Sequence, residues 1–416
     1  MSDNSPAVTR RGVLAAGGAA LLGAAGGLAV GISTAPGAPA ATPAAAGPAE
    51  PPSTTAPPST TAPAPVPFHG VHQAGVATAP TTYQTFVGLD LRRASRDDAA
   101  AALRLVTDDA ARLTQGTPAL GDTEPEIAAN PAGLTVTAGI ARQLLERVGL
   151  HDRIPPQLAP IPAFATDRFE DPWEQTDLLL QVGSDDPLTL AHTVRMLTKD
   201  LSTLTTVRWV QPGFRSPSPA LPGSHASRNL MGQVDGTVNP RVGTPDFDEV
   251  VWLPDGSHWW ANGTVLVLRR IRMLLDTWEI LDRSAQEAVI GRRLDTGAPI
   301  GAMVESDPVP FDGTDDRGLP LIAQDAHVRV AHAKTTPEMI LRRPYSYDAG
   351  MRDGTNDVGL LFAAYMQDPR TSFIPMQQRI AASDAFNRWN TTIGSASYLL
   401  PGGAREGGVI GEAAFA

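Results

Sequence analysis

The chain has 416 residues and a formal net charge of −11 at pH 7, and no segment is rich in lysine or arginine. Nucleic acid is therefore not expected as a partner. The chain contains no cysteine, which excludes disulfides, thiolate nucleophiles and thiolate-ligated metal centres. Any redox chemistry then depends on His, Asp, Glu or Tyr side chains. The length suits two domains with an interior large enough to enclose a cofactor.

The first 67 residues are predicted to precede the folded part. Residues 1–40 resemble a twin-arginine signal peptide, because Arg10 and Arg11 stand before an apolar, Gly- and Ala-rich run. That run is short and weakly hydrophobic, so a stable membrane span is not expected, with a retained anchor as the alternative. Residues 41–67 are almost wholly Ala, Pro, Thr, Ser and Gly, which is typical of a disordered linker. The sequence predicts an exported protein that is extracellular, periplasmic or associated with the cell envelope.

Strand and helix patterns alternate from residue 68 onward. Ser95 is the expected N-cap of the first helix, which carries Asp97 and Asp98 in its first turn. The predicted strand and helix pairs are 85–91 with 95–114, 134–140 with 141–148, and 177–182 with 187–199. Such a repeated alternation is the pattern of a ferredoxin-like α+β sandwich.

A second set of elements follows residue 244, with a long strand at 264–273 and one helix at about 278–292. The two sets are similar in plan. We therefore predict an α+β fold of two ferredoxin-like domains, at 68–240 and 241–416, with antiparallel sheets and with helices on the outside.

Three arginines interrupt the 264–273 strand. Alternation places Arg270 and Arg272 on one face of the sheet and Arg269 on the other. A solvated sheet face is one interpretation, and a site for anionic groups is the other.

The segment 231–240 carries a single carboxylate between glycines. Gly232 and Gly236 allow positive φ or a close approach to a flat ligand, and Asp235 is the group there that can move a proton. A plain Asp-Gly turn between two strands is the alternative interpretation.

Five segments, in this order along the chain, resemble the dye-decolourising peroxidase family. The resemblance spans nearly all of residues 68–402, and it is closest to an exported branch with members linked to iron uptake and haem-iron release. The matching segments are the start at 68–75, the Gly-x-x-Asp-Gly motif at 232–237, the haem-ligating histidine at His327, the distal-arginine segment at 340–343 and the apolar lid at 359–362.

The resemblance implies one haem b per chain, held between the two sheets, with His327 as the axial ligand of the iron. Asp384 is the candidate carboxylate that holds the other imidazole nitrogen, and an ordinary acid at a helix N-terminus is the alternative. Asp235 is implied to be the catalytic acid–base group and Arg342 the group that stabilises the peroxide anion. Arg343 competes with Arg342, because adjacent strand residues point to opposite faces.

Further residues are expected at the haem. Leu360 and Phe362 would lie on one strand face and exclude bulky ligands from the iron. Arg329 would bind a propionate, on the expectation that its segment is extended and that it shares a face with His327. The remaining candidates are Gly232 and Gly236, which allow close approach, and Thr237 and Asn239, which fix the distal loop or its waters.

The function implied is that of a haem-dependent peroxidase, which reduces hydrogen peroxide while it oxidises organic donors such as dyes and phenolics. Two alternatives are a deferrochelatase-like release of iron from haem and a non-catalytic secreted haem-binding protein. The presence of both Asp235 and Arg342 argues against a carrier, which needs only the axial ligand. A homo-oligomer is among the expected assemblies.

Overall fold

The N-terminal half of the fold is a four-stranded antiparallel sheet covered by two helices. The computed structural model describes residues 64–224, 226–352 and 354–416, so the predicted signal peptide and nearly all of the predicted linker lie outside the described residues. The strands pair in the order β4-β1-β3-β2, which is the ferredoxin-like order. Their bounds are β1 Tyr83–Leu91, β2 Thr135–Ile140, β3 Leu178–Ser184 and β4 Thr205–Phe214.

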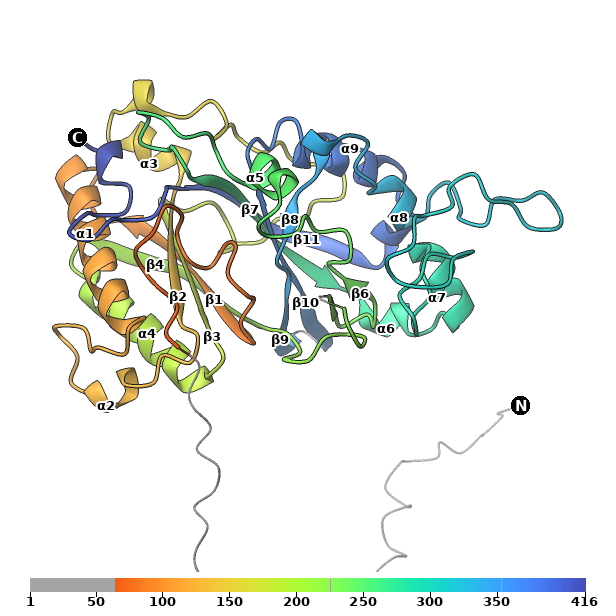
Figure 1. Ribbon diagram of the computed structural model, residues 1–416, viewed down its shortest axis with the longest axis horizontal. Helices are drawn as coiled ribbons and strands as arrows, with labels where there is room; N and C mark the ends of the chain where they lie inside the picture. The colour runs from red at the N-terminus through yellow and green to blue at the C-terminus, as the bar shows by residue number, and fades with distance from the viewer. Residues whose placement is uncertain (1–63, 225, 353) are drawn as a thin grey trace, which may run out of the picture. The chain divides into compact units, whose positions relative to one another are not determined.

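The helices α1 (Arg96–Leu113) and α4 (Pro187–Asp200) pack side by side on one face of this sheet (Figure 1). The α1 helix begins at Ser95, whose hydroxyl accepts the N–H of Asp98 at 3.2 Å, as predicted. Apolar residues of both helices and of the sheet form one buried cluster. Between these elements lie α2 Pro125–Ala128, α3 Arg142–Arg147 and the 3₁₀ turn η1 His151–Arg153.

The C-terminal half repeats this topology. Its strands pair in the order β11-β7-β10-β9, which is the ferredoxin-like order again. The predicted duplication is therefore present in the topology. The strands are β7 Thr264–Met273, β9 Tyr345–Arg352, β10 Thr355–Met366 and β11 Asn390–Leu400, and the short strand β8 Leu341–Arg342 pairs with β10.

The two sheets join edge to edge. Leu399 of β11 pairs with Ile140 of β2, and Phe214 of β4 pairs with Ser346 of β9, so the strands close into a ring. Aromatic and aliphatic side chains from both halves fill its interior. The predicted α+β fold with two ferredoxin-like domains is confirmed, and the two sheets meet at their edges instead of facing each other.

The crossover from β7 to β9 differs from its counterpart in the N-terminal half. In place of the 18-residue α1, it contains α6 Leu275–Trp278, α7 Arg283–Ile290 and α8 His327–Val330, none longer than 8 residues. Together with α9 (Phe373–Ser383), these short helices lie over the outer face of β7 and β10 (Figure 1). The remaining elements are β5 Ser227–Arg228, β6 Val234–Asp235, α5 Pro245–Val251, η2 Thr336–Glu338, η3 Ala385–Arg388 and η4 Glu412–Ala414.

One predicted helix was wrong, and strand β4 was not predicted. The single helix expected at 278–292 is broken, because Asp282 accepts the N–H of Ala285 at 2.8 Å and starts α7 as a separate helix. Gly291, at φ +87°, ends α7. The strand β4 was not assigned from the sequence, because Pro212 and Gly213 interrupt its pattern.

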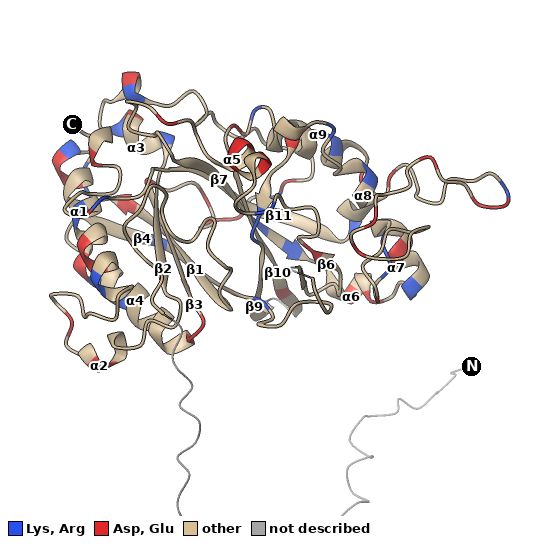
Figure 2. Ribbon diagram, viewed as in Figure 1, with Lys and Arg blue, Asp and Glu red and all other residues tan. Residues whose placement is uncertain are grey.

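The arginines of β7 are not on a solvated face. Arg269 and Arg270 are only 1% and 5% exposed. Arg269 pairs with Asp167, whereas Asp357 accepts hydrogen bonds from both Arg270 and Arg272. Burial is tolerated because each guanidinium meets a carboxylate. Figure 2 shows basic residues within the strands of the C-terminal half, whereas the charged residues of the N-terminal half lie mainly on its helices.

Across the described residues, we find no helix that combines the length and the apolar character needed to span a membrane.

Candidate active site

The acid loop, residues 229–240, is built on a short β-hairpin. Ser227 pairs with Asp235 and Arg228 with Val234, so Asp235 ends a strand rather than sitting in the turn of the hairpin. The glycines beside it have positive φ, +78° at Gly232 and +109° at Gly236. A side chain at either position would strain the backbone that presents the carboxylate.

Asp235 forms an ion pair with Arg342 of β8. The distance from Asp235 Oδ1 to Arg342 Nη1 is 2.8 Å, and the two side chains are only 12% and 24% exposed. The guanidinium does not approach along a hydrogen-bonding direction, so this buried oxygen has no hydrogen-bond donor among the described residues. Asp235 Oδ1 is thus a buried acceptor that can still receive a hydrogen bond.

The choice between the two adjacent arginines follows from the strand geometry. Arg342 turns toward the acid loop, whereas Arg343 is 6% exposed and donates to the carbonyls of Val76 and Thr78 in the N-terminal half. Arg343 therefore joins the two halves of the fold and does not reach Asp235.

The acid loop is fixed at both ends of its 237–239 segment. Thr237 donates from Oγ1 to Glu305 Oε1 at 2.8 Å. Asn239 makes two bonds to the backbone of Arg342, donating to its carbonyl at 2.6 Å and accepting its N–H at 3.0 Å. These contacts come from segments far apart in the sequence.

His327 meets the carboxylate proposed for it. His327 Nδ1 lies 2.6 Å from Asp384 Oδ2, and the Asp384 side chain is fully buried. A carboxylate accepts hydrogen bonds, so the hydrogen of this contact lies on Nδ1, and in the neutral imidazole Nε2 then carries the lone pair that a metal requires. Asp384 Oδ1 also accepts the N–H of Phe386 at 2.9 Å, so Asp384 is in addition the N-cap of η3.

An apolar surface connects the histidine side to the acid loop. Leu360 and Phe362 project from the same face of β10, because strand side chains alternate. They belong to one buried cluster with Met231, at the base of the acid loop, and with Phe386, whose ring centroid is 5.3 Å from that of His327. The predicted site residues therefore lie on the outer face of the C-terminal sheet, not between the two sheets.

The geometric argument for Arg329 was wrong. Residues 327–330 form a helix, where positions two apart are separated by about 200° and do not share a face. Arg329 instead donates to the carbonyls of Phe311, Ile322 and Ala323.

Two arginines near the site were not singled out from the sequence. Burial lowers the pKa of Arg292, and the nearby positive charge of Arg342 lowers it further, although Glu305 acts in the opposite sense. Burial also lowers the pKa of Arg215, which lies within range of the charge of Asp235. The segment Gly291-Arg292-Arg293 resembles the exported branch of the family, but the resemblance gave Arg292 no role, and no motif marks Arg215.

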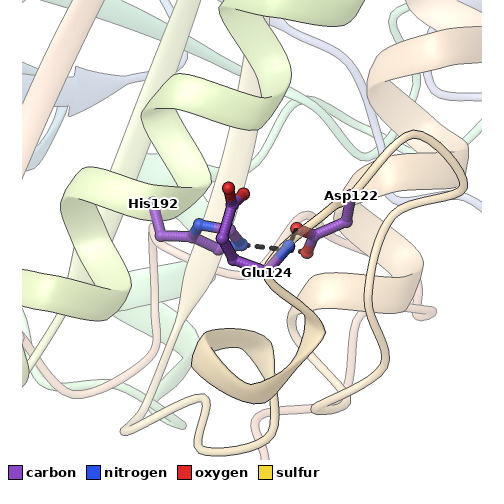
Figure 3. A group of neighbouring side chains, drawn as sticks. All are labelled: Asp122, Glu124 and His192. Carbon is purple, nitrogen blue, oxygen red and sulfur yellow. Dashed lines mark hydrogen bonds and ion pairs between the residues drawn. The ribbon is translucent and has the colours of Figure 1, made fainter.

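A separate group of potential metal ligands lies in the N-terminal half (Figure 3). His192 Nε2 is 2.9 Å from Asp122 Oδ2, and the carboxylate of Asp122 also accepts the N–H of Glu124 at 2.9 Å. The His192–Asp122 contact satisfies both side chains without an ion and ties the loop before α2 to α4.

The arrangement of the site fits a flat, metal-containing cofactor. Besides the Asp235 oxygen, Gln233 Nε2 of the same loop is buried without a hydrogen-bond partner in the described part of the chain. An apolar sheet face, a histidine whose ring lies beside Phe386 of its cluster, and a buried acid–arginine pair are thus grouped in one region. Such a group of residues suits an oxidoreductase that uses a metal-containing cofactor.

Comparison with known proteins identifies the family. The models "Dyp-type peroxidase, N-terminal" and "Dyp-type peroxidase, C-terminal" match residues 73–215 and 226–405. The chain therefore belongs to the Dyp-type peroxidase family, and it is a peroxidase.

The relatives are consistent with this assignment. A dye-decolorizing peroxidase of Thermobifida fusca is 42% identical over 356 residues, which cover 82% of this chain and 83% of the relative. A deferrochelatase of Escherichia coli K12 is 31% identical over 357 residues, covering 81% and 84%. The crystal structure of a DyP-type peroxidase from Cellulomonas bogoriensis superposes with a TM-score of 0.80 at 45% identity, covering 84% of this chain and 98% of that one.

Proposed function

We propose that this peroxidase binds haem through His327 and reduces hydrogen peroxide with the help of Asp235 and Arg342. The electrons come from organic donors such as dyes and phenolics, which are oxidised. The observation that carries the proposal is the ion pair of 2.8 Å between Asp235 and Arg342, in a loop whose Met231 shares one apolar cluster with Phe386 beside His327. Haem, when bound, would supply the iron at which peroxide is reduced, and it would hold the two oxidising equivalents of peroxide until the organic donors supply electrons.

The residues of the chain divide the remaining work. Asp235 Oδ1 accepts the proton of hydrogen peroxide and returns it to the leaving oxygen. Arg342 places a positive charge beside the anion that this proton transfer creates. Asp384 holds Nδ1 of His327, which orients the imidazole and increases its basicity as a ligand. Leu360 and Phe362 keep the cofactor face apolar and exclude bulky ligands.

A spectrum and a rate measurement test this proposal together. The purified protein is expected to show a Soret band and to decolourise an anthraquinone dye with hydrogen peroxide at acidic pH. A protein with a full complement of haem and no turnover would contradict the assigned catalytic roles. The same preparation, supplied with haem and an iron chelator without peroxide, tests the deferrochelatase activity suggested by the E. coli relative.

We also propose export by the twin-arginine route to the cell envelope or beyond. The support is the Arg10-Arg11 pair before an apolar run, followed by the Pro-rich segment. Replacing both arginines with lysine should retain the protein inside the cell, as measured by fractionation. Unchanged export would contradict the proposal.

A further inference from the structure

The inference concerns how the catalytic acid and the arginine are held in register, and it rests on the roles proposed for Asp235 and Arg342. The two residues belong to different chain segments. Arg342 lies in β8, a strand of two residues that pairs with β10 on one edge through Leu341 and Arg342. On the other edge of β8, no neighbouring strand is present to hold the backbone of Arg342 by hydrogen bonds in the described part of the chain.

Asn239 occupies that other edge. Its amide donates to the carbonyl of Arg342 at 2.6 Å and accepts the N–H of the same residue at 3.0 Å. A neighbouring strand would engage these same two backbone groups, so the Asn239 amide substitutes for a strand partner.

Asn239 is in turn fixed to the acid. The N–H of Asn239 donates to the carbonyl of Gly236 at 3.1 Å and closes a tight turn directly after Asp235. Gly236, at φ +109°, is the first residue of this turn and links it to Asp235. The turn therefore connects Asp235 to Asn239 over four residues, and Asn239 is hydrogen-bonded to the backbone of Arg342.

We propose that Asn239 is a positioning residue that locks Arg342 to the acid loop, so that the carboxylate and the guanidinium face the peroxide site as one rigid unit. Asn239 does not itself move a proton or bind the anion in this proposal. Its loss releases the backbone of Arg342, and a misplacement of about 1 Å costs on the order of 10²-fold in rate.

The test uses the haem-loaded full-length protein. Asn239→Ala should lower the second-order rate constant for hydrogen peroxide, followed at the Soret band, by about 10- to 100-fold, while haem content and the KM for the dye stay at the wild-type values. Asn239→Asp keeps the acceptor for the Arg342 N–H but loses the donor, so it should fall between Asn239→Ala and wild type. It also supplies the result if the alanine variant does not fold. Thr244→Ala is the matched control, because Thr244 donates to the Arg241 carbonyl nearby and does not touch Arg342.

A double-mutant cycle separates positioning from a general structural effect. In an Arg342→Leu background, Asn239→Ala should cause no further loss of peroxide reactivity, since its effect passes through Arg342. A wild-type rate in both Asn239 variants, an equal loss in Thr244→Ala, or an additive loss in the double variant would each overturn the proposal. If the catalytic role proposed for Arg342 is wrong, the outcome is different: the Arg342→Leu single variant then reacts with peroxide at the wild-type rate.

Discussion

Asp384 Oδ2 and His327 Nδ1 lie 2.6 Å apart although 57 residues separate them in the chain. The same carboxylate caps η3, so the position of the histidine ring is tied to the start of a helical turn. The imidazole is thereby oriented by the fold before any cofactor binds.

Replacement of the histidine tests whether it is the ligand. His327→Ala should abolish or greatly weaken haem binding, because it removes the nitrogen that would ligate the iron. The measurement is the Soret absorbance per protein after reconstitution with haem. His332→Ala is the control, since His332 lies 5 residues further along, past the end of α8. Loss of the Soret band in His332→Ala instead would move the ligand to that residue.

Asp384→Asn removes the negative charge behind the histidine and keeps the side-chain shape. Haem affinity or peroxidase activity should fall by about 10- to 100-fold, as is usual when the hydrogen-bond partner of a ligating histidine is lost. Haem titration and steady-state turnover measure the two effects. An unchanged affinity and an unchanged rate would leave Asp384 with its capping role alone.

Asp235→Asn should retain haem and lose proton transfer. The amide fills the same space but cannot accept the peroxide proton, so the rate of reaction with hydrogen peroxide should fall by roughly 10²–10⁴-fold. Stopped-flow absorbance at the Soret band gives this rate. A rate within a factor of about two of wild type would assign the proton transfer elsewhere.

Replacing the two adjacent arginines should have different effects, on the reaction rate at Arg342 and on stability at Arg343. Arg342→Leu should lower peroxide reactivity by about 10²–10³-fold, because a charge that stabilises the anion is lost. Arg343→Leu should instead destabilise the fold by about 1–3 kcal/mol, because it leaves the carbonyls of Val76 and Thr78 without their buried donor. Rates per haem and thermal midpoints of both variants decide the matter, and the reverse pattern would contradict the structure.

Stability should also depend on pH through a buried acid in the N-terminal half. Burial, and then the negative charge of Asp200, raise the pKa of Asp109 to about 7, with a smaller contribution from Asp108 and an opposing one from Arg112. In the unfolded chain the pKa is about 3.9, so between about pH 4 and 7 the folded state binds more protons. The free energy of unfolding therefore falls as pH rises through this window.

Asp109→Asn, which resembles the protonated acid, should remove this dependence. We expect it to raise the free energy of unfolding by about 1–2 kcal/mol above pH 7 and to change it little near pH 4. Denaturant unfolding at the two pH values measures the difference. Asp108→Asn is the control, because that carboxylate is exposed, pairs with Arg112 and contributes only a small part of the shift at Asp109. A similar gain in both variants would contradict the assignment to Asp109.

The sequence predicted the fold where local patterns are strong. The strand at 264–273 was placed at its bounds, and Ser95 was placed as an N-cap, because periodicity and capping are local properties. The closure of the two sheets depends on single residue pairs such as Phe214 with Ser346, which no local pattern encodes. The burial of Arg269 was likewise missed, because its partner Asp167 lies 102 residues away.

The site was predictable to the extent that motifs mark it. The glycines around Asp235 and the order of segments pointed to the acid, the arginine and the histidine. The contacts that hold them were not readable from the sequence, because Glu305 belongs to no motif. The error at Arg329 came from taking a short helix for an extended segment. Which face a side chain occupies depends on secondary structure that a four-residue helix does not signal.

The short helices between β7 and β9 have a consequence for stability. In the N-terminal half, the 18-residue α1 covers its sheet, whereas the corresponding crossover of the C-terminal half supplies only short helices. Under the function proposed above, haem on this face would add to the covering layer, so haem binding should raise the free energy of unfolding.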